Sequence, residues 1–431
     1  MTKKAVLGCE LNNQFLQVSY APEGEMPITL KNPATGGLLQ IPLVIGRHKD
    51  SGQWMYGEDA QKKLREWDGN VTDRLLEHFG ESIRLYGELY TYEELLHLFL
   101  SHALKLAMYC IEALEKEPAE LLGMTISVEP FTAEMLPYLK KSTAGLQIPQ
   151  GQIHLQGHEE SLFSYMIHQP EKLLGFSTGV FDLTDEHMVT YRMEMNQRTT
   201  PVVTSIQKDE DTGIVKRKHY SSIIEHDKQL EQMDEMLAEY VQRFTEGRIV
   251  TSIYLIGDGF AKDWYQKSRR LLCRGRKVYA GNNLFSKGAA FSAASRIWPG
   301  TEKEDFLFLG REMLRMNVGM KVIDEGKEVY LPLLDAGQSW YEAKSETEIL
   351  LESADEITLL ITPIFTGKTY EETIRLDEEE TRPGRAFRFR MLLEMKSADT
   401  LRIRLRDEGF GSFYAPVYAQ KEFTIQLTEA Q

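Results

Sequence analysis

The stretch Phe176–Met193 reads FSTGVFDLTDEHMVTYRM, and it decides the fold prediction. Its first part, up to Leu183, is rich in apolar, β-favouring residues. Its second part, from Val189, alternates apolar and polar residues with the period of a strand. The polar tripeptide Thr184-Asp185-Glu186 separates the two parts. The sequence therefore predicts a β-hairpin near the middle of the chain.

The composition is that of a folded protein of two or three domains. The chain has 431 residues, of which 42% are hydrophobic and 27% are charged, so it can bury substantial cores. Its net charge of −15 argues against binding to nucleic acids or to anionic membranes. Cys9, Cys110 and Cys273 lie far apart and form neither a disulfide framework nor a zinc pattern, which indicates a reducing compartment.

The sequence shows neither a leader pattern nor a membrane-span pattern. The first residues, MTKKAVLGCELNN, lack the long apolar core of a signal peptide. The most apolar long segment, Leu95–Leu114, includes His97, Lys105 and Glu112, which argue against a membrane span. We therefore expect a cytoplasmic protein that does not bind membranes.

Strands and helices alternate over the first 300 residues. The pair Asn12-Asn13 suits a hairpin turn, and Thr91–Glu94 is a capping box that starts a helix to Leu114. The run Ile249–Ile256 is continuously apolar, as in a buried parallel strand. Further strands are expected at 5–9, 15–20, 41–45, 122–128 and 152–155, and further helices at 57–67, 132–139, 159–167, 222–244, 262–272 and 283–296.

The pattern changes near Trp298-Pro299-Gly300, after which short alternating strands and turns predominate. Strands are expected at 329–334, 348–352, 357–364, 373–376, 387–395, 401–406 and 423–427. This succession predicts an all-β domain. The apolar run Phe306–Leu309 lies at the join and is expected to dock on a surface.

Several segments, taken in order, carry the motifs of one known family. Leu7–Asn13 resembles a first phosphate hairpin, Val180–Leu183 resembles a second one, and Ile253–Gly259 is similar to the Gly-rich turn of an adenosine site. The other matching segments are Gly57–Ala60, Thr125–Phe131, Lys287–Ala290, Asp305–Leu309 and Leu401–Gly411. Because this order extends over nearly the whole chain, the sequence resembles the actin-like ATPase superfamily, and specifically the DnaK-type heat-shock chaperones.

The resemblance implies an α/β chain with an actin-like (ribonuclease H-like), two-lobed ATPase fold followed by an all-β sandwich. The nucleotide-binding-type domain would span residues 1–300, with lobe I at 1–172, lobe II at 173–300 and a reduced cleft subdomain. A hydrophobic linker would follow at 301–318. Residues 319–431 would form a peptide-binding-type sandwich without the helical lid of the family.

In that family, hairpin turns offer backbone N–H groups to the phosphates of ATP or ADP, and acidic residues hold Mg²⁺ through water. The resemblance therefore assigns Glu10 and Asp182 to the Mg²⁺-bound waters, with no direct metal ligand. The residues that it places against the nucleotide are Asn12, Asn13, Thr184, Asp185, Gly257, Asp258 and Gly259.

The turns depart from the family pattern. Asn12-Asn13 replaces Gly-Thr, Thr184-Asp185-Glu186 replaces three glycines, and Glu10 replaces an Asp. The family's catalytic lysine has no counterpart, because Asp73 or Arg74 lies at its position. We therefore expect weak or absent ATP hydrolysis, with ATP or ADP and Mg²⁺ as the cofactors or with none.

Three functions are compatible with the sequence. The first is a DnaK-like protein that binds a protein partner or peptide, as a chaperone or a scaffold. The second is an active ATP-dependent chaperone in which Glu10, Asp182 and Asp185 organise Mg²⁺. The third is an actin-like assembly component, for which the sequence gives no oligomeric state. The alternative for the acidic residues themselves is that they are turn and strand-end carboxylates without a function.

Arginines alternate with apolar residues in the predicted strands 387–395 and 401–406. If these strands pair through a turn at 397–400, one face of the sheet becomes a basic ladder. Its counter-charges would come from the acidic run 377–380 or from an acidic partner. By resemblance, Leu350 and Leu351 would line a peptide groove, although both also suit a core.

Overall fold

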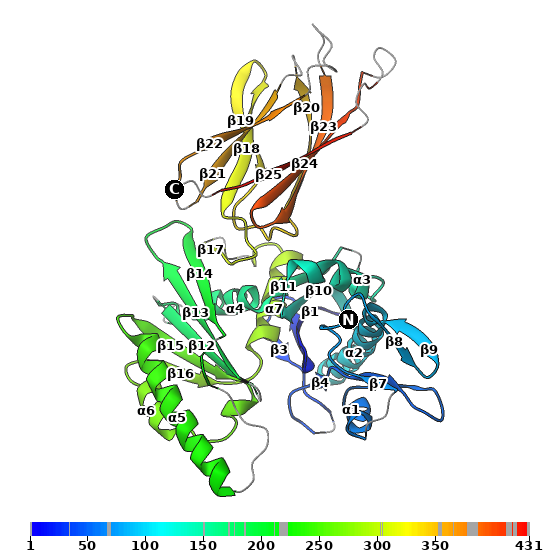
Figure 1. Cartoon of the computed structure of the whole chain (residues 1–431), viewed down its shortest axis with the longest axis vertical. Helices are drawn as coiled ribbons and strands as arrows, with labels where there is room; N and C mark the ends of the chain where they lie inside the picture. The colour runs from blue at the N-terminus through cyan, green and yellow to red at the C-terminus, as the bar shows by residue number, and fades with distance from the viewer. Residues whose placement is uncertain are drawn as a thin grey trace. The chain divides into compact units, whose positions relative to one another are not determined.

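The computed structural model describes the chain in two compact units, Met1–Phe306 and Leu307–Gln431 (Figure 1). The division falls inside the segment predicted as the linker. The description leaves out residues 1, 34, 67–69, 150, 171–172, 176, 185–186, 211, 215–222, 302, 304, 352–355, 365, 377–386, 411–415, 417–419 and 429–431, and the side chains of 223–227.

One sheet of the first unit is built from the N-terminal segments. Its strands are β1 (Lys3–Asn12), β2 (Phe15–Pro22), β3 (Ile28–Thr29), β4 (Gln40–Pro42), β10 (Ala119–Glu129) and β11 (Ile153–Gly157). The strand order is β11-β10-β1-β2-β3, and β4 also pairs with β2. The pairs β1–β10 and β10–β11 are parallel, whereas β1, β2 and β3 are antiparallel neighbours. β1 and β2 are buried along most of their length, which fits a sheet covered on both faces.

The other large sheet contains the predicted hairpin. Its strands are β12 (Ser177–Leu183), β13 (Met188–Asn196), β14 (Val202–Asp209), β15 (Val250–Ile256), β16 (Lys277–Ala280) and β17 (Phe306–Phe308). The strand order is β16-β15-β12-β13-β14-β17. β12 and β13 pair antiparallel with Val180 opposite Tyr191, so the hairpin prediction is confirmed. The parallel strand predicted at Ile249–Ile256 is confirmed as β15, beside β12.

The two sheets belong to topologically equivalent halves. We call β1 to α4 the first half and β12 to α7 the second half. The helices are α2 (Tyr92–Glu115), α3 (Leu136–Thr143) and α4 (His158–Ile167) in the first half, and α5 (Ile223–Thr245), α6 (Gln266–Leu272) and α7 (Leu284–Ile297) in the second. In each half, three antiparallel strands precede a helix, a strand, a helix, a strand and a helix. In each, the fourth and fifth strands extend the sheet in parallel from the first.

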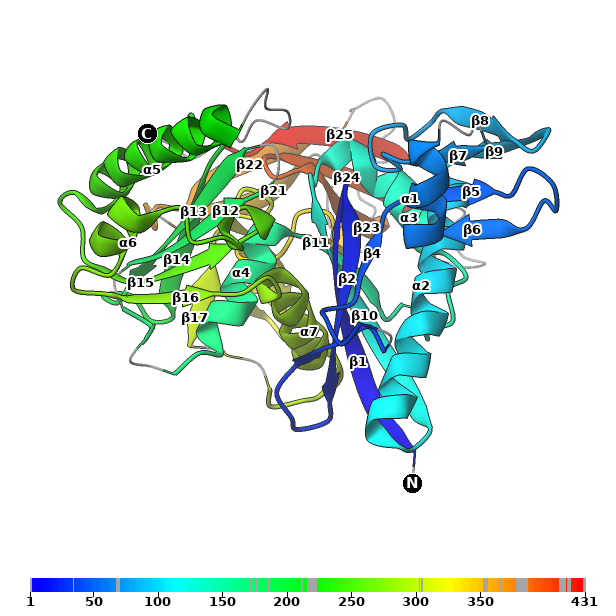
Figure 2. The same ribbon diagram turned by 90° about the horizontal axis from the view of Figure 1, so that it is seen from below.

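Helices α4 and α7 lie between the two sheets (Figure 2). α7 packs against β1, β2, β10 and α4, so a helix of the second half covers the sheet of the first. Glycines allow this close packing. A Cβ atom on Gly8 would lie 2.0 Å from the backbone nitrogen of Ala290, and one on Gly288 would lie 1.9 Å from the carbonyl oxygen of Ser161. The two halves therefore interlock through backbone contacts that larger residues would prevent.

The halves differ by an insertion between β3 and α2. It contains α1 (Gly57–Arg65) and the short strands β5 (Ile45–Arg47), β6 (Trp54–Tyr56), β7 (Val71–Thr72), β8 (Ser82–Leu85) and β9 (Glu88–Thr91). In the second half, α5 is the one element that the described residues form between β14 and β15.

Helix α2 begins at the predicted capping box, which is confirmed. The Thr91 side chain accepts a hydrogen bond from the Glu94 backbone N–H at 3.3 Å, and the Glu94 carboxylate accepts one from the Thr91 N–H at 2.8 Å. By length and composition alone, α2 could cross a membrane. The core helix of a soluble protein passes the same test, and half of the most apolar stretch of α2 is buried in the unit.

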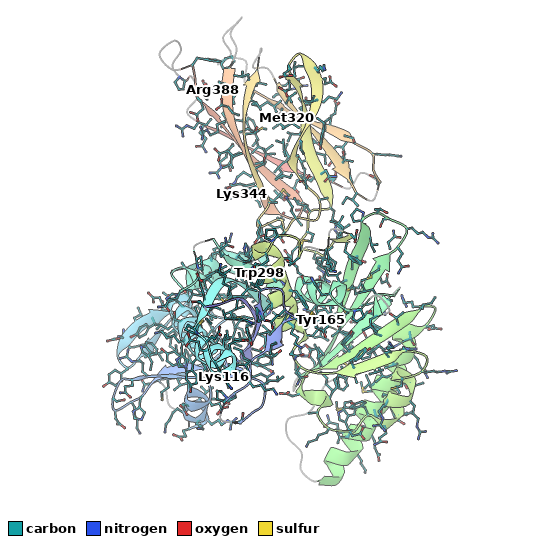
Figure 3. The ribbon with its side chains drawn as sticks, turned by 180° about the vertical axis from the view of Figure 1, so that it is seen from behind. Lys116, Tyr165, Trp298, Met320, Lys344 and Arg388 are labelled. Atoms are coloured by element: carbon teal, nitrogen blue, oxygen red, sulfur yellow. The ribbon has the colours of Figure 1, made fainter. Side chains whose placement is uncertain are left out.

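The second unit consists of two four-stranded sheets, as the all-β prediction requires. The strands are β18 (Met316–Asp324), β19 (Lys327–Leu334), β20 (Lys344–Leu351), β21 (Glu356–Pro363), β22 (Tyr370–Arg375), β23 (Phe387–Ser397), β24 (Thr400–Asp407) and β25 (Lys421–Gln426). The sheet orders are β19-β18-β21-β22 and β20-β23-β24-β25. β18 begins inside the segment predicted as the linker. Side chains of β18 such as Met320 are buried, whereas Arg388 of β23 lies on the surface of the unit (Figure 3).

The predicted pairing of the two arginine-bearing strands is confirmed by β23 and β24. Their arginines find carboxylates within the same sheet. Arg388 forms two hydrogen bonds to Glu348, of 2.5 and 2.8 Å, and Arg402 contacts Glu394 at 2.7 Å. The acidic run 377–380, one of the two predicted sources of counter-charge, lies outside the described residues. These internal ion pairs leave less free positive charge for an acidic partner than the sequence suggested.

Candidate functional site

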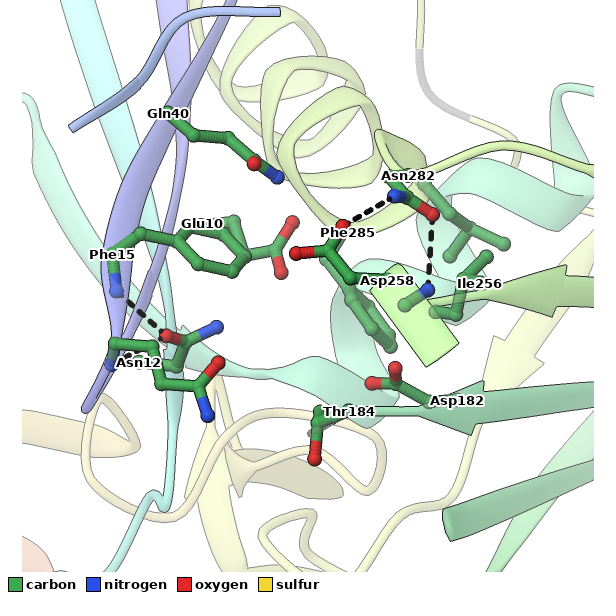
Figure 4. A pocket seen from close by; sticks show the side chains of 13 residues that line it. Glu10, Asn12, Phe15, Gln40, Asp182, Thr184, Ile256, Asp258, Asn282 and Phe285 are labelled. Atoms are coloured by element: carbon green, nitrogen blue, oxygen red, sulfur yellow. Dashed lines mark hydrogen bonds between the residues drawn. The ribbon is translucent and has the colours of Figure 1, made fainter. Parts of the chain in front are cut away.

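A cavity of about 40 Å³ lies between the two halves of the first unit (Figure 4). We call it the cleft cavity. Its lining comes from the β1–β2 turn, the end of β12, the segment after β15 and the start of α7. It includes Glu10, Asn12, Gln14, Phe15, Gln40, Asp182, Thr184, Gly257, Asp258, Asn282 and Phe285. The fold thus brings together Glu10, Asn12, Asp182, Thr184, Gly257 and Asp258, which the sequence singled out from three separate segments.

In the first turn, the Asn12 side chain occupies the backbone donors. Its Oδ1 accepts hydrogen bonds from the backbone N–H groups of Gln14 at 2.9 Å and of Phe15 at 3.0 Å (Figure 4). Such a turn is self-contained, because an Asn oxygen takes the place of an external acceptor. These two N–H groups are therefore not free to bind a phosphate while Asn12 keeps this conformation.

The turn after β15 shows the same arrangement. The backbone N–H of Gly257 donates to Oδ1 of Asn282 at 2.9 Å, and the Asn282 amide nitrogen donates to Asp258 at 3.2 Å (Figure 4). Asn282 precedes α7 and carries no motif. In both turns, a side-chain amide of the protein thus accepts from the donors nearest the cleft cavity.

The glycines of this turn are explained by packing against β12. Gly257 has a φ of +87°, and a Cβ atom there would lie 2.2 Å from the carbonyl oxygen of Leu183. A Cβ atom on Gly259 would lie 2.3 Å from the Leu183 side chain. Close approach of two chain segments, rather than of a ligand, therefore suffices to require glycine at both positions.

Acidic side chains dominate the electrostatics of the cleft cavity. Glu10 is 6% exposed, and its carboxylate points into the cavity (Figure 4). Burial and the nearby Asp182 hold the pKa of Glu10 well above its ordinary value. Burial, together with Glu129 and Asp258, raises the pKa of Asp182 to about 7, and Lys208 opposes this shift. The site thus favours neutral carboxyl groups or a positive charge in the cavity.

Lys208 is a residue that sequence reasoning missed. Its ammonium, on β14, forms an ion pair with Glu129 at the end of β10, with 2.5 Å between nitrogen and oxygen, and another with Glu210. Only 11% of its side chain is exposed. Burial lowers the pKa of Lys208, but the two carboxylates outweigh that effect and raise it overall. No local sequence pattern predicts the Lys208–Glu129 ion pair, since it joins strands of different halves.

His158 is a second residue without a predicted role. Its ring stacks on Phe285, which lines the cleft cavity, with 3.9 Å between ring centroids. Neither ring nitrogen has a hydrogen-bond partner among the described residues. Burial, assisted by Lys208, lowers the pKa of His158 to about 3, so the imidazole is neutral at physiological pH.

Comparison with known proteins places this architecture in a family. The model described as "Family of unknown function (DUF5716) C-terminal" matches residues 26–311. The chain belongs to the DUF5716 family. A second model, "Domain of unknown function (DUF8552)", matches residues 313–427. A search of curated proteins found no match.

In this DUF5716 member, the family match begins at residue 26, after the β1–β2 hairpin. Glu10 and Asn12 therefore lie outside the matched region, whereas Asp182, Asp258 and Asn282 lie inside it. The DUF8552 match covers β18 to β25 and so coincides with the second unit.

Other predicted site residues lie away from the cleft cavity of this DUF5716 member. Asn13 is not part of the lining, and its amide nitrogen donates to Glu77 at 3.0 Å. The backbone oxygen of Gly259 accepts from the indole of Trp264 at 2.8 Å. Asp185, with Glu186, lies outside the described residues. The structure describes no group of three or more His, Cys, Asp or Glu side chains arranged to hold a metal ion.

The two candidate peptide-binding residues lie on β20 of the second unit. Leu350 is 67% exposed, and Leu351 is half-buried. Leu350 stands opposite Arg388 in the ladder with β23. Leu350 is therefore not a core residue, and the peptide-groove role of both leucines stays a prediction.

Proposed function

We propose that this DUF5716 member is a DnaK-like protein of actin-like, two-lobed fold that acts by binding a protein partner or peptide, with weak or absent ATP hydrolysis. The repeated topology of the two halves supports the fold assignment, since each contains the same succession of three antiparallel strands and three helices with two parallel strands. A cleft cavity between the two halves is consistent with descent from a nucleotide cleft.

The observation that carries the proposal is the occupation of the turn donors. The N–H groups of Gln14, Phe15 and Gly257 all donate to Asn12 or Asn282. A phosphate would have to displace these amides, so it would gain little net hydrogen bonding. The chain therefore does not offer ATP the free backbone N–H groups on which ATP hydrolysis depends in the DnaK-type family.

Charge and size point in the same direction. In their ionised forms Glu10, Asp182 and Asp258 would repel a triphosphate, and one pair of unit charges about 4 Å apart costs about 4 kcal/mol near a protein surface. The volume of about 40 Å³ is far below the roughly 300 Å³ at which small-molecule sites begin. Lys208 does not supply a free positive charge, because Glu129 and Glu210 already bind its ammonium.

Calorimetric titration of the full chain with Mg-ATP, paired with a phosphate-release assay, tests this proposal. We expect no saturable binding at micromolar concentrations and no turnover above the rate of Asp182→Ala protein. Micromolar affinity together with Asp182-dependent turnover would overturn it.

Partner binding is tested separately by a peptide array. Leu350→Asp should reduce retention, whereas Leu89→Asp, which changes an exposed leucine of β9, should not. Equal retention by all three proteins would contradict the peptide-binding role of Leu350.

A working ATPase is the second candidate, and one observation favours it. Glu10 points into the cleft cavity, and no hydrogen-bond partner for it is found in the described part of the chain. A hydrated Mg²⁺ between Glu10 and Asp182 would supply the missing positive charge and would lower both raised pKa values. The turnover assay with Asp182→Ala distinguishes this function from the first.

A further inference from the structure

A larger cavity opens on the second half and shares no lining residue with the cleft cavity. Its volume of about 840 Å³ falls within the range of roughly 300–1,000 Å³ that is usual for small-molecule sites. Arg243 of α5 lines it together with Arg274 and Arg276, which lie between α6 and β16. We call this site the arginine pocket.

The three arginines of this pocket have no carboxylate partner in the part of the chain that the structure describes. Among the described side chains, no Asp or Glu lies within 4.0 Å of any of their guanidinium nitrogens. Neighbouring arginines do find such partners, since Arg269 of α6 pairs with Asp263 at 2.9 Å and Arg248 pairs with Glu194 at 3.8 Å. The chain has 65 acidic and 50 basic residues, so carboxylates are not scarce. Three guanidinium groups without a described carboxylate partner line one cavity, which makes it a candidate site for an external anion.

Arg276 provides a second, independent observation. Its Nη1 is shielded from solvent and has no hydrogen-bond partner among the described residues, while its Nε donates to the carbonyl oxygen of Arg274 at 3.2 Å. Burying a donor without an acceptor is unfavourable, and more so on a charged group. The planar guanidinium forms its strongest hydrogen bonds with phosphate and carboxylate oxygens. A bound oxyanion would satisfy this donor once the guanidinium turns towards the cavity, because Nη1 is shielded from a ligand in the present conformation.

The lining also limits the kind of anion. Glu239 and Glu246 line the same cavity and offset part of the arginine charge, so the pocket suits a small ligand with one anionic group. Their carboxylates can accept hydrogen bonds from hydroxyl groups on such a ligand. A long polyanion would instead experience the net charge of −15, since repulsion extends over roughly 8–10 Å at moderate salt.

We propose that the arginine pocket binds the phosphate group of a small molecule, either a free phosphate ion or a phosphate ester of a hydroxylated compound. Arg274 and Arg276 hold the phosphate oxygens, and Arg243 faces it from α5. This ligand site is independent of the function proposed for the cleft cavity, because the two cavities are formed by different segments.

Calorimetric titration of the full chain at low salt with glucose 6-phosphate, inorganic phosphate and glucose tests the proposal. We expect saturable binding of at least one phosphate probe and none of glucose. Glucose 6-phosphate binding more tightly than inorganic phosphate identifies an ester as the ligand, and equal affinities identify free phosphate. The absence of binding by both phosphate probes would overturn the proposal.

Single arginine substitutions test whether the phosphate binds in the arginine pocket. Arg276→Gln should weaken binding by about tenfold or more, since a charge-assisted hydrogen bond is lost. Arg274→Gln should act in the same direction, and because Arg274 is exposed this variant tests the site even where Arg276→Gln fails to fold. Arg269→Gln removes an arginine of the preceding helix α6 whose guanidinium is already paired, and it should leave the affinity unchanged. Equal affinity in all three variants would place the phosphate elsewhere and refute the proposal.

Discussion

Lys208 on β14 and Glu129 at the end of β10 form a 2.5 Å ion pair that joins the two halves of the first unit. The ammonium also offsets the acidic groups around Asp182, since it opposes the rise in the pKa of that carboxyl. This one side chain therefore links the two halves and moderates the negative charge of the cleft cavity.

Replacement of Lys208 by Met should destabilise the first unit by about 1 to 3 kcal/mol, because it leaves a partly buried Glu129 unpaired. The pKa of Asp182 should rise further in this variant, which NMR titration of the carboxyl can follow. Lys267→Met is the matched control, since the exposed Lys267–Glu235 pair at 3.3 Å should contribute less than about 1 kcal/mol. Equal loss of stability in both variants would show that the Lys208–Glu129 pair contributes no more to stability than an exposed ion pair does.

The raised pKa of Asp182 predicts a loss of stability at high pH. The folded chain keeps a proton on Asp182 up to about pH 7, whereas the unfolded chain releases it near 3.8. Stability from this group is therefore full below pH 3.8 and is lost as pH rises towards 7. Asp182→Asn removes the titration, so its stability relative to the natural chain should increase by roughly 2 to 3 kcal/mol from about pH 5 to about pH 8.

Urea unfolding of both proteins at the two pH values measures this difference. Asp59→Asn serves as the control, because that side chain is 81% exposed on α1 and should show no comparable change with pH. A constant difference between Asp182→Asn and the natural chain would exclude a half-buried, protonated Asp182.

His158 predicts the opposite dependence on pH. Its pKa falls from 6.5 to about 3 on folding, so its contribution to stability is full above 6.5 and is lost as pH falls towards 3. A Phe ring can keep the stacking on Phe285 without titrating. The stability of His158→Phe relative to the natural chain should therefore rise by about 2 kcal/mol from about pH 7 to about pH 5.

The same urea series, with His187→Phe as an exposed control, checks this value. In the natural chain the effects of His158 and Asp182 have opposite signs over much of the acidic range and partly cancel. Only the single variants separate them. A His158→Phe difference that stays flat between the two pH values would mean that the imidazole has hydrogen-bond partners or reaches solvent.

Much of the fold was predictable because it depends on local patterns. The hairpin from β12 to β13, the parallel strand β15 and the capping box of α2 each have a periodicity or motif of their own. The strands β5 to β9 contain only two to four residues each, too few to show a period. Their existence depends on tertiary contacts that the sequence does not display.

The residues of the candidate site, too, were predictable only where a local sequence pattern marks them. Glu10 and Asp182 lie near the ends of β1 and β12, and Asp258 follows β15, so local motifs could point to them. Lys208 and Asn282 belong to segments without a motif, and each acts on a residue that lies far away in the sequence. The sequence could predict where the acidic groups lie. It could not show that Lys208 already binds Glu129, or that the Asn282 side chain already accepts from the backbone N–H of Gly257, which a ligand would otherwise contact.

The contact between β1 and α7 predicts a steric effect at Gly8. A methyl group there would lie 2.0 Å from the backbone nitrogen of Ala290, so the helix would have to move. Gly8→Ala should therefore lower the unfolding free energy by about 3 kcal/mol or more, as measured by urea denaturation. Gly281→Ala places its methyl group 3.9 Å from the nearest side-chain atom and should change stability by less than about 0.5 kcal/mol. A tolerated Gly8→Ala would contradict the close packing of α7 on the first sheet.

The occupied turns predict that nucleotide binding can be restored. Asn12→Gly frees the N–H groups of Gln14 and Phe15, and Asn282→Gly frees that of Gly257. Because a hydrogen bond to a charged phosphate contributes about 1.5 kcal/mol or more, the double variant should bind Mg-ATP at least about tenfold more tightly than the natural chain.

Asn196→Gly is the control, since Asn196 accepts from the backbone N–H of Arg198 in a turn that does not line the cleft cavity. Calorimetric titration compares the three proteins after thermal unfolding has confirmed that each is folded. If the double variant gains no affinity over the control, then the acidic charge of Glu10 and Asp182, rather than the loss of backbone donors, is what excludes the nucleotide.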